Sequence, residues 1–183
     1  LLSEADSIIL SGLRILDKFK KGISQKAYEI LRADVIGNEY GNLCRAITYS
    51  DLTTRQSWKP VMKEINKAID TSKGHYIALS SGYIAFLYEK AKLDLILESN
   101  QRLFEEVYRK LRNRYSGELR EKLLAYSIAE DYDKAVYFHG IDADSFTACL
   151  KDAYELIESP FLKQEVMRKL ETIARGAIAF DFA

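Results

Sequence analysis

Apolar residues recur at intervals of three and four positions along nearly all of this 183-residue chain. Ile9, Leu13 and Leu16 follow this spacing in the first segment, and Leu162 and Val166 repeat it near the end. Such a stripe places its members on one face of an α-helix. The chain has only 2 prolines and 9 glycines, so it offers few places for the tight turns that connect strands. The pattern therefore predicts an all-α fold, either a multi-helix bundle or a short α-solenoid of helical hairpins.

The expected helices follow from capping residues and from the breaks between apolar stripes. They cover Ser3–Lys21 and Tyr76–Glu98, and others begin near Ser24, Pro60, Asn100, Leu119, Asp144 or Ser145, and Ser159. The longest stretch without a helical pattern is Asp131–Asp144.

Two of these helices leave an alternative open. Gly37 and Gly41 fall inside the second one, which either breaks there or continues to Tyr49, because glycine weakens a helix interior. Tyr76–Leu79 is compatible either with the start of the most apolar helix or with a short strand.

The second half of the chain contains an internal repeat. Ser116–Leu124 and Ser159–Met167 share a pattern of serine, leucine, charged residues and two aliphatic residues, and they lie 43 positions apart. Phe104 and Phe146 precede them at nearly the same spacing. This repeat favours two stacked helical hairpins, and chance similarity between amphipathic helices is the alternative.

The last residues change from a helical to an alternating pattern. Gly176 is a typical residue after a helix end, and Ile178, Phe180 and Phe182 then point to one side of a strand. A lone strand leaves its backbone hydrogen-bonding groups unpaired. We therefore expect a helical domain over residues 1–176, followed at residues 177–183 by a strand-like tail that begins another domain.

This tail resembles the segment that opens the thioredoxin-like domain of TlpA-type thiol:disulfide oxidoreductases, in the AhpC/TSA/thioredoxin-like family. The family pattern G-x-x-A-x-D-F matches at Gly176, Ala179, Asp181 and Phe182. Phe180, the remaining residue of this domain junction, stands where many members carry proline. Leu119–Tyr132 and Ser159–Glu171 also look similar to the helical region that precedes this opening segment in some extracytoplasmic members.

The resemblance implies an extracytoplasmic protein whose catalytic Cys-x-x-Cys pair follows Ala183. The signal segment would precede Leu1. No catalytic residue can be transferred to this chain, and it would act as a non-catalytic helical accessory domain that positions the redox domain or contacts other proteins. Its partners would be its own downstream domain or a second copy. The alternative is a stand-alone α-helical repeat module that binds protein or peptide.

Composition excludes several other classes of function. The chain has 27 basic and 27 acidic residues, so no net charge attracts it to nucleic acid or to an anionic membrane. No apolar run reaches the length of a membrane span. Cys44 and Cys149 are far apart, which predicts two separate buried thiols or, alternatively, one structural disulfide rather than a metal or redox motif. We find no motif for a catalytic, cofactor-binding or metal site.

Two clusters of charged residues have both a functional and a structural interpretation. A basic strip interleaved with tyrosines is compatible with RNA binding, but intervening glutamates favour a solvated, salt-bridged helix face. Its members are Arg109, Lys110, Arg112, Arg114 and Arg120, with Tyr108 and Tyr115. The second cluster has the residue types of a metal site, yet it is better explained as a loop whose last aspartate caps a helix. It comprises His139, Asp131, Asp133, Asp142 and Asp144.

Overall fold

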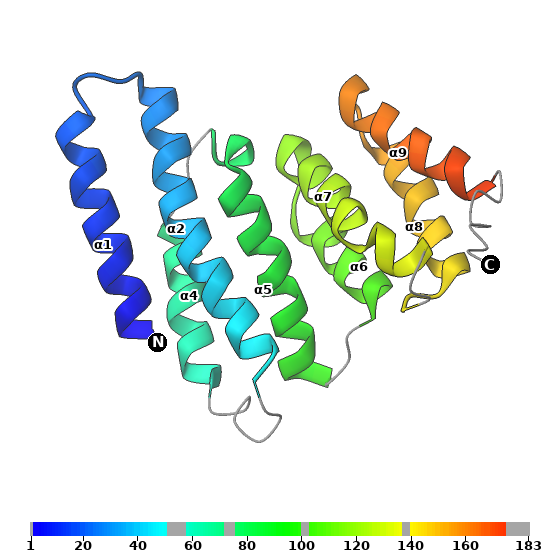
Figure 1. Cartoon of the computed structure of the whole chain (residues 1–183), viewed down its shortest axis with the longest axis horizontal. Helices are drawn as coiled ribbons and strands as arrows, with labels where there is room; N and C mark the ends of the chain where they lie inside the picture. Colours follow the sequence, from blue (N-terminus) through cyan, green and yellow to red (C-terminus); the bar gives the residue numbers. More distant parts are fainter. Residues whose placement is uncertain (1, 51–57, 72–75, 100–102, 137–139, 175–183) are drawn as a thin grey trace, which may run out of the picture. The chain divides into compact units, whose positions relative to one another are not determined.

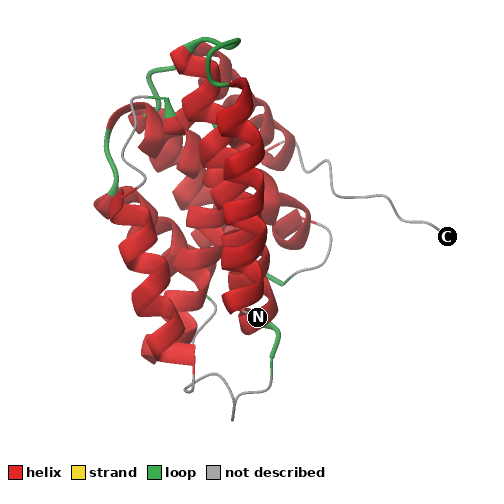
Figure 2. Ribbon diagram, turned by 90° about the vertical axis from the view of Figure 1, so that its left-hand side faces the viewer, coloured by secondary structure: helices red, strands yellow, loops and turns green. Residues whose placement is uncertain are grey.

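The computed structural model describes residues 2–50, 58–71, 76–99, 103–136 and 140–174 (Figure 1). Every regular element within these ranges is a helix, as the colouring of Figure 2 shows, so the predicted all-α fold is confirmed. The strand-like tail at 177–183 and the junction residues lie outside the described ranges. The boundary after Gly176 therefore stays a prediction. The junction residues are Gly176, Ala179, Phe180, Asp181 and Phe182.

The chain divides into two compact units, Leu1–Gln101 and Arg102–Ala183. The sequence patterns did not indicate this division. Unit 1 contains α1 (Leu2–Phe19), α2 (Gln25–Thr48), α4 (Lys59–Thr71), the short 3-10 helix η2 (Ile77–Leu79) and α5 (Ser81–Ser99). Unit 2 contains α6 (Phe104–Arg114), α7 (Gly117–Val136), α8 (Ala143–Leu156) and α9 (Pro160–Ala174).

In unit 1, α1 and α2 form an antiparallel hairpin. The predicted cap Ser24 accepts a hydrogen bond from the backbone N–H of Ala27, which begins α2 as expected. Two tyrosines of α2 bind aspartates of α1: the Tyr28 hydroxyl lies 2.6 Å from Asp17, and the Tyr40 hydroxyl lies 2.9 Å from Asp6. These bonds fix the register between the two helices.

Glycines bring α2 and α5 into backbone contact. A Cβ atom placed on Gly37 would lie 2.5 Å from the backbone of Gly82 and Tyr83, closer than real Cβ contacts come. A Cβ atom placed on Gly41, one turn later, would lie 3.4 Å from Cα of Phe86. The helix therefore continues through both glycines to Thr48. The close approach of α5 outweighs their low helix propensity.

The start of α5 is fixed by a side chain from α2. The Asp34 carboxylate accepts hydrogen bonds from the Ser80 hydroxyl at 2.6 Å and from the Gly82 backbone N–H at 3.0 Å. The Ser80 oxygen in turn accepts from the N–H of Tyr83, so it caps the helix. The strand alternative for Tyr76–Leu79 is wrong, since this stretch contains a 3-10 turn that leads into the cap.

Unit 2 consists of two stacked hairpins, α6/α7 and α8/α9. The first helices contact each other, as do the second helices. Phe104 and Phe146, the residues that marked the repeat in the sequence, have ring centroids 4.9 Å apart. The Glu121 carboxylate of α7 accepts from the Ser159 backbone N–H at the start of α9, at 2.9 Å. The repeat therefore corresponds to a real structural repeat rather than to chance.

Three predicted helix limits in unit 2 need correction. The segment expected to be irregular from Asp131 remains helical to Val136, because Ala135 and Val136 are buried and hold the last turn in the core. The cap of α8 is Asp142 rather than Asp144 or Ser145, since its carboxylate accepts from the Ser145 N–H at 2.9 Å.

The third correction concerns α6. This helix begins at Phe104 with Leu103 at the N-cap position, and Leu103 offers no side-chain bond. Asn100, the cap expected from the sequence, lies outside the described residues.

Candidate functional site

The basic strip lies mainly on α6. Arg109 forms an ion pair at 2.6 Å with Glu106 of the same helix, and Arg112 reaches Asp152 of α8 at 2.9 Å. The Arg114 guanidinium stands 5.8 Å from the ring centre of Tyr115. Arg109 and Arg112 are thus neutralised by acidic neighbours. For these two residues the salt-bridged interpretation of the strip is confirmed.

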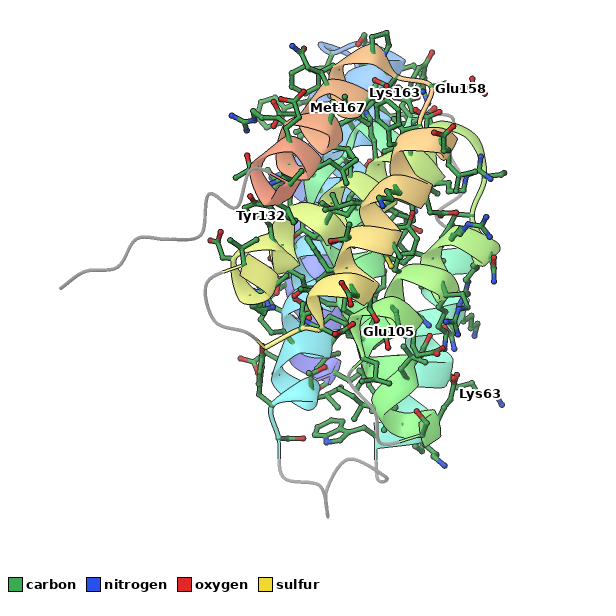
Figure 3. All side chains as sticks on the ribbon, turned by 90° about the vertical axis from the view of Figure 1, so that its right-hand side faces the viewer. Lys63, Glu105, Tyr132, Glu158, Lys163 and Met167 are labelled. Carbon is green, nitrogen blue, oxygen red and sulfur yellow. The ribbon has the colours of Figure 1, made fainter. Side chains whose placement is uncertain are left out.

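A groove opens between α6 and α8, the first helices of the two hairpins. It has a volume of about 560 Å³, and Figure 3 views unit 2 from the side on which Glu105 is labelled. The groove is lined from α6 by Glu105, Tyr108, Arg109, Arg112 and Asn113, and from α8 by Ser145, Ala148, Cys149 and Asp152.

Asp152 organises the polar side of this groove. Its Oδ2 atom accepts from the Tyr108 hydroxyl at 2.8 Å and from Nε of Arg112 at 2.9 Å. Burial raises the pKa of Tyr108 above its usual value, and the hydrogen bond to Asp152 raises it further. Tyr108 is therefore a neutral donor that holds Asp152 in place, and it cannot act as a base at physiological pH.

Cys149 lies in the same groove and is 9% exposed. Burial raises the pKa of its thiol to about 11, and the negative charges of Glu105 and Asp152 act in the same direction. In unit 1, burial raises the pKa of Cys44 to about 12. Both cysteines are free, which confirms separate buried thiols and not a disulfide. Neither forms the thiolate that nucleophilic chemistry requires near neutral pH.

The groove presents hydrogen-bonding groups of both charges. Glu105 and Asp152 carry negative charge while Arg109 and Arg112 carry positive charge, so its formal charges balance. Asn113 and Ser145 add uncharged polar groups. A polar segment with mixed charge could form hydrogen bonds with these groups.

Two aspartates of the second cluster, Asp131 and Asp142, serve structural roles. Asp131 pairs with Lys134 at 2.5 Å within α7. The hydrogen bonds from Ser145 lower the pKa of Asp142, which keeps the helix cap ionised. Among the residues described, no three potential ligands are grouped for a metal ion. His139 lies outside the described ranges. In the same ranges, no helix has the length and apolar character needed to cross a membrane.

The sequence patterns did not indicate that Asp152 lines a groove together with Arg112. The apolar stripe of α8 drew attention to Cys149 and its neighbours, and Asp152 was not singled out. The repeat spacing contained a usable signal, because it places α6 and α8 side by side. Polar residues about 40 positions after Arg112 should therefore face it, and Asp152 is one of them.

No protein-family model, curated protein or solved structure matches this chain. These comparisons thus give no support to the resemblance between the C-terminal segment and TlpA-type oxidoreductases.

Proposed function

We propose that this chain is a non-catalytic helical module that works through contacts with another protein segment. The uncovered outer side of α9 carries the proposal: Met167 is 40% exposed and Phe161 is 69% exposed. The repeat equivalent of Met167, 43 residues earlier, is Leu124, which is 0% exposed. Leu124 lies inside the hairpin stack, whereas Met167 lies on its last described helix (Figure 3). Another segment packed on α9 would complete the stack.

The partner on α9 is proposed to be a thioredoxin-like domain that begins at residues 177–183. The match at Gly176, Ala179, Asp181 and Phe182 supports this assignment, together with the position of that segment directly after α9. In this proposal the helical module positions the redox domain of an extracytoplasmic thiol:disulfide oxidoreductase. The chemistry belongs to the partner, because the thiols of Cys44 and Cys149 are buried and protonated.

The decisive experiment extends the chain into its natural downstream sequence. A Cys-x-x-Cys within about 40 residues of Ala183 is expected. The longer protein should show slower amide hydrogen exchange in α9 than the 183-residue chain does. Met167→Lys should abolish this protection, while the control Leu10→Lys, at an exposed apolar position on α1 in unit 1, should preserve it. Equal exchange of α9 in the short and long proteins would contradict the proposal.

Non-catalytic behaviour has its own test. The 183-residue chain should not accelerate reduction of insulin disulfides by dithiothreitol, since a lone protonated thiol has no partner to resolve a mixed disulfide. Turnover that disappears on Cys149→Ala would show that the groove is an active site.

A second candidate function, peptide binding by a stand-alone repeat module, is favoured by the groove between α6 and α8. Concave surfaces formed by successive repeats commonly bind extended segments. Peptides selected on the chain from a displayed random library should lose affinity when Ala148→Trp fills the groove. Ala129→Trp, on an exposed position of α7 outside the groove, should leave binding unchanged. Peptides that bind both variants equally would exclude the groove as their site.

A further inference from the structure

The apolar stripe of helix α1 is wider than the part of it that helix α2 covers. On the covered part, Ile9 and Leu16 are 6% and 8% exposed. The other part of the stripe carries Ile8, Ile15 and Phe19, which are 47%, 54% and 61% exposed. In Figure 1, α1 lies at the edge of unit 1 with α2 on one side only, and it runs across the front of Figure 2.

The exposed part extends onto α2. Asp17 binds Tyr28 and Gly12 lies against Val35, so the register places Ile15 level with Leu31. Helical phase puts these two residues on the same side of the hairpin, opposite the hydrogen bond between Tyr40 and Asp6. Leu31 is 45% exposed. We define the α1 face as Ile8, Ile15, Phe19 and Leu31.

Charges beside the α1 face are arranged symmetrically. Ser11 is central, Glu4 lies seven residues before it, and Lys18 lies seven residues after it. Glu4 and Lys18 are both exposed, and neither forms an ion pair with another residue in the described ranges. A helix with this order of charges is complementary to an antiparallel copy of itself, which is the requirement for a two-fold symmetric interface.

We propose that the α1 face pairs with the α1 face of a second copy of this chain, antiparallel and crossing near Ser11. Ile8 of one copy then packs against Ile15 of the other, and each Glu4 meets the opposite Lys18. The small Ser11 side chain at the crossing lets the two helices approach closely. This pairing uses unit 1 alone and does not depend on the contact proposed for α9.

The first test measures the oligomeric state of the 183-residue chain by sedimentation velocity over a range of concentrations. The wild type should dimerise. Ile15→Glu should raise the dimer dissociation constant at least about tenfold, because it places two like charges in the apolar contact. Leu10→Glu is the matched control, since Leu10 is 55% exposed on another side of α1 and should leave dimerisation unchanged. Circular dichroism of both variants checks that they remain folded.

The second test examines the antiparallel register. Glu4→Lys and Lys18→Glu should each weaken the dimer, and the double variant should regain affinity because it restores opposite charges across the two-fold axis. Ser11→Cys should form a disulfide between copies under mild oxidation, whereas Ser7→Cys should do so more slowly. A monomeric wild type, equal effects of Ile15→Glu and Leu10→Glu, or no recovery in the double charge variant would overturn the proposal.

Discussion

Each unit contains a pair of parallel helices in contact, and the two pairs pack differently. In unit 1, α2 and α5 run parallel, with Gly37 against Gly82 and Gly41 against Phe86. In unit 2, α6 and α8 also run parallel, with Phe104 against Phe146. The first pair packs backbone against backbone, whereas the second leaves a groove of about 560 Å³.

Side-chain size at the crossing explains this difference. Glycine removes the Cβ atoms that would otherwise separate α2 from α5, so the contact closes. Between α6 and α8, the larger side chains of Tyr108, Arg112 and Asp152 stand between the helices and are joined by hydrogen bonds. Two similar hairpin stacks can therefore produce a solid core or a polar groove through the residues at one contact.

The ion pairs at the two contacts also differ in how deeply they are buried. Lys90 in α5 pairs with Asp94 at 2.6 Å, and their side chains are 2% and 15% exposed. Arg112 and Asp152 pair at 2.9 Å with side chains 41% and 35% exposed. Water can replace a lost partner only in the second pair. The closed contact should thus be much less tolerant of mutation than the groove.

The largest effect is expected for Asp94→Ala. This change leaves the Lys90 ammonium buried without its carboxylate, and the free energy of unfolding should fall by about 3 kcal/mol. Lys90→Met, which replaces the cation by an apolar side chain of similar size, should stay within about 1 kcal/mol of the wild type. Urea unfolding monitored by circular dichroism measures both. Similar losses in the two variants would show that the pair itself stabilises unit 1.

The next prediction compares the effect on stability of alanine at Gly37 and at Gly41 in α2. Gly37→Ala should cost about 2 kcal/mol, because the new methyl group would meet backbone atoms of α5 that cannot move independently. Gly41→Ala places its methyl group at ordinary contact distance from Phe86, and the better helix propensity of alanine should give a gain of up to about 1 kcal/mol. If both variants lost the same stability, the backbone contact at Gly37 would not be the tight point of the crossing.

A smaller loss is expected in the groove. Asp152→Ala removes the acceptor of Tyr108 and Arg112. Arg112 is 41% exposed and then reaches water, whereas the buried Tyr108 hydroxyl loses its acceptor, so the cost should be about 1 kcal/mol. Tyr108→Phe removes one of the two bonds and should cost less. Thermal unfolding of the two variants beside Asp94→Ala measures the contrast between the two contacts. A loss in Asp152→Ala as large as in Asp94→Ala would refute the difference in solvent access.

Periodicity in the sequence was sufficient to predict the all-α fold and most helix starts, because apolar stripes and caps such as Ser24 are local signals. The repeat also predicted stacked hairpins in unit 2. The course of α2 through Gly37 was not decided, since only the partner helix explains glycine in a helix interior. The extent of α7 to Val136 was missed for a similar reason: burial by neighbouring helices outweighed a polar sequence.

The groove was less predictable than the fold. Arg112 was identified as part of a basic strip, and its salt-bridged interpretation is confirmed, but the acidic residues expected beside the strip were the glutamates interspersed in it. Asp152 lies on another helix, 40 residues away. A pattern within one helix cannot reveal an ion pair between two helices. The hairpin repeat is the additional signal, because it predicts that α6 and α8 are neighbours.

The smallest effect is expected in the rates at which the two thiols are alkylated. Cys44 is 0% exposed in the closed contact, and Cys149 is 9% exposed in the groove. Iodoacetamide at mildly alkaline pH should therefore modify Cys149 first, and Cys44 should react only as the protein unfolds. Mass spectrometry of peptides from partly labelled protein measures the two rates. Equal rates would mean that α2 and α5 open as readily as the groove does.

The raised pKa values of the two thiols also make the free energy of unfolding depend on pH, and they fix the sign of this dependence. In the unfolded chain a thiol loses its proton near pH 9, whereas in the folded protein burial raises the pKa to about 12 for Cys44 and about 11 for Cys149. Between these values the unfolded state holds fewer protons, so stability is fully present below pH 9 and declines as the pH rises.

Up to about pH 11 the two thiols contribute equally to this decline, and above it only Cys44 continues to contribute. Cys44→Ala should therefore reduce the decline more than Cys149→Ala does, and the difference should appear above about pH 11. Tyr40, whose pKa burial raises to about 12, contributes equally in both variants. A steeper decline in Cys44→Ala than in Cys149→Ala would reverse the assignment of the closed and open contacts.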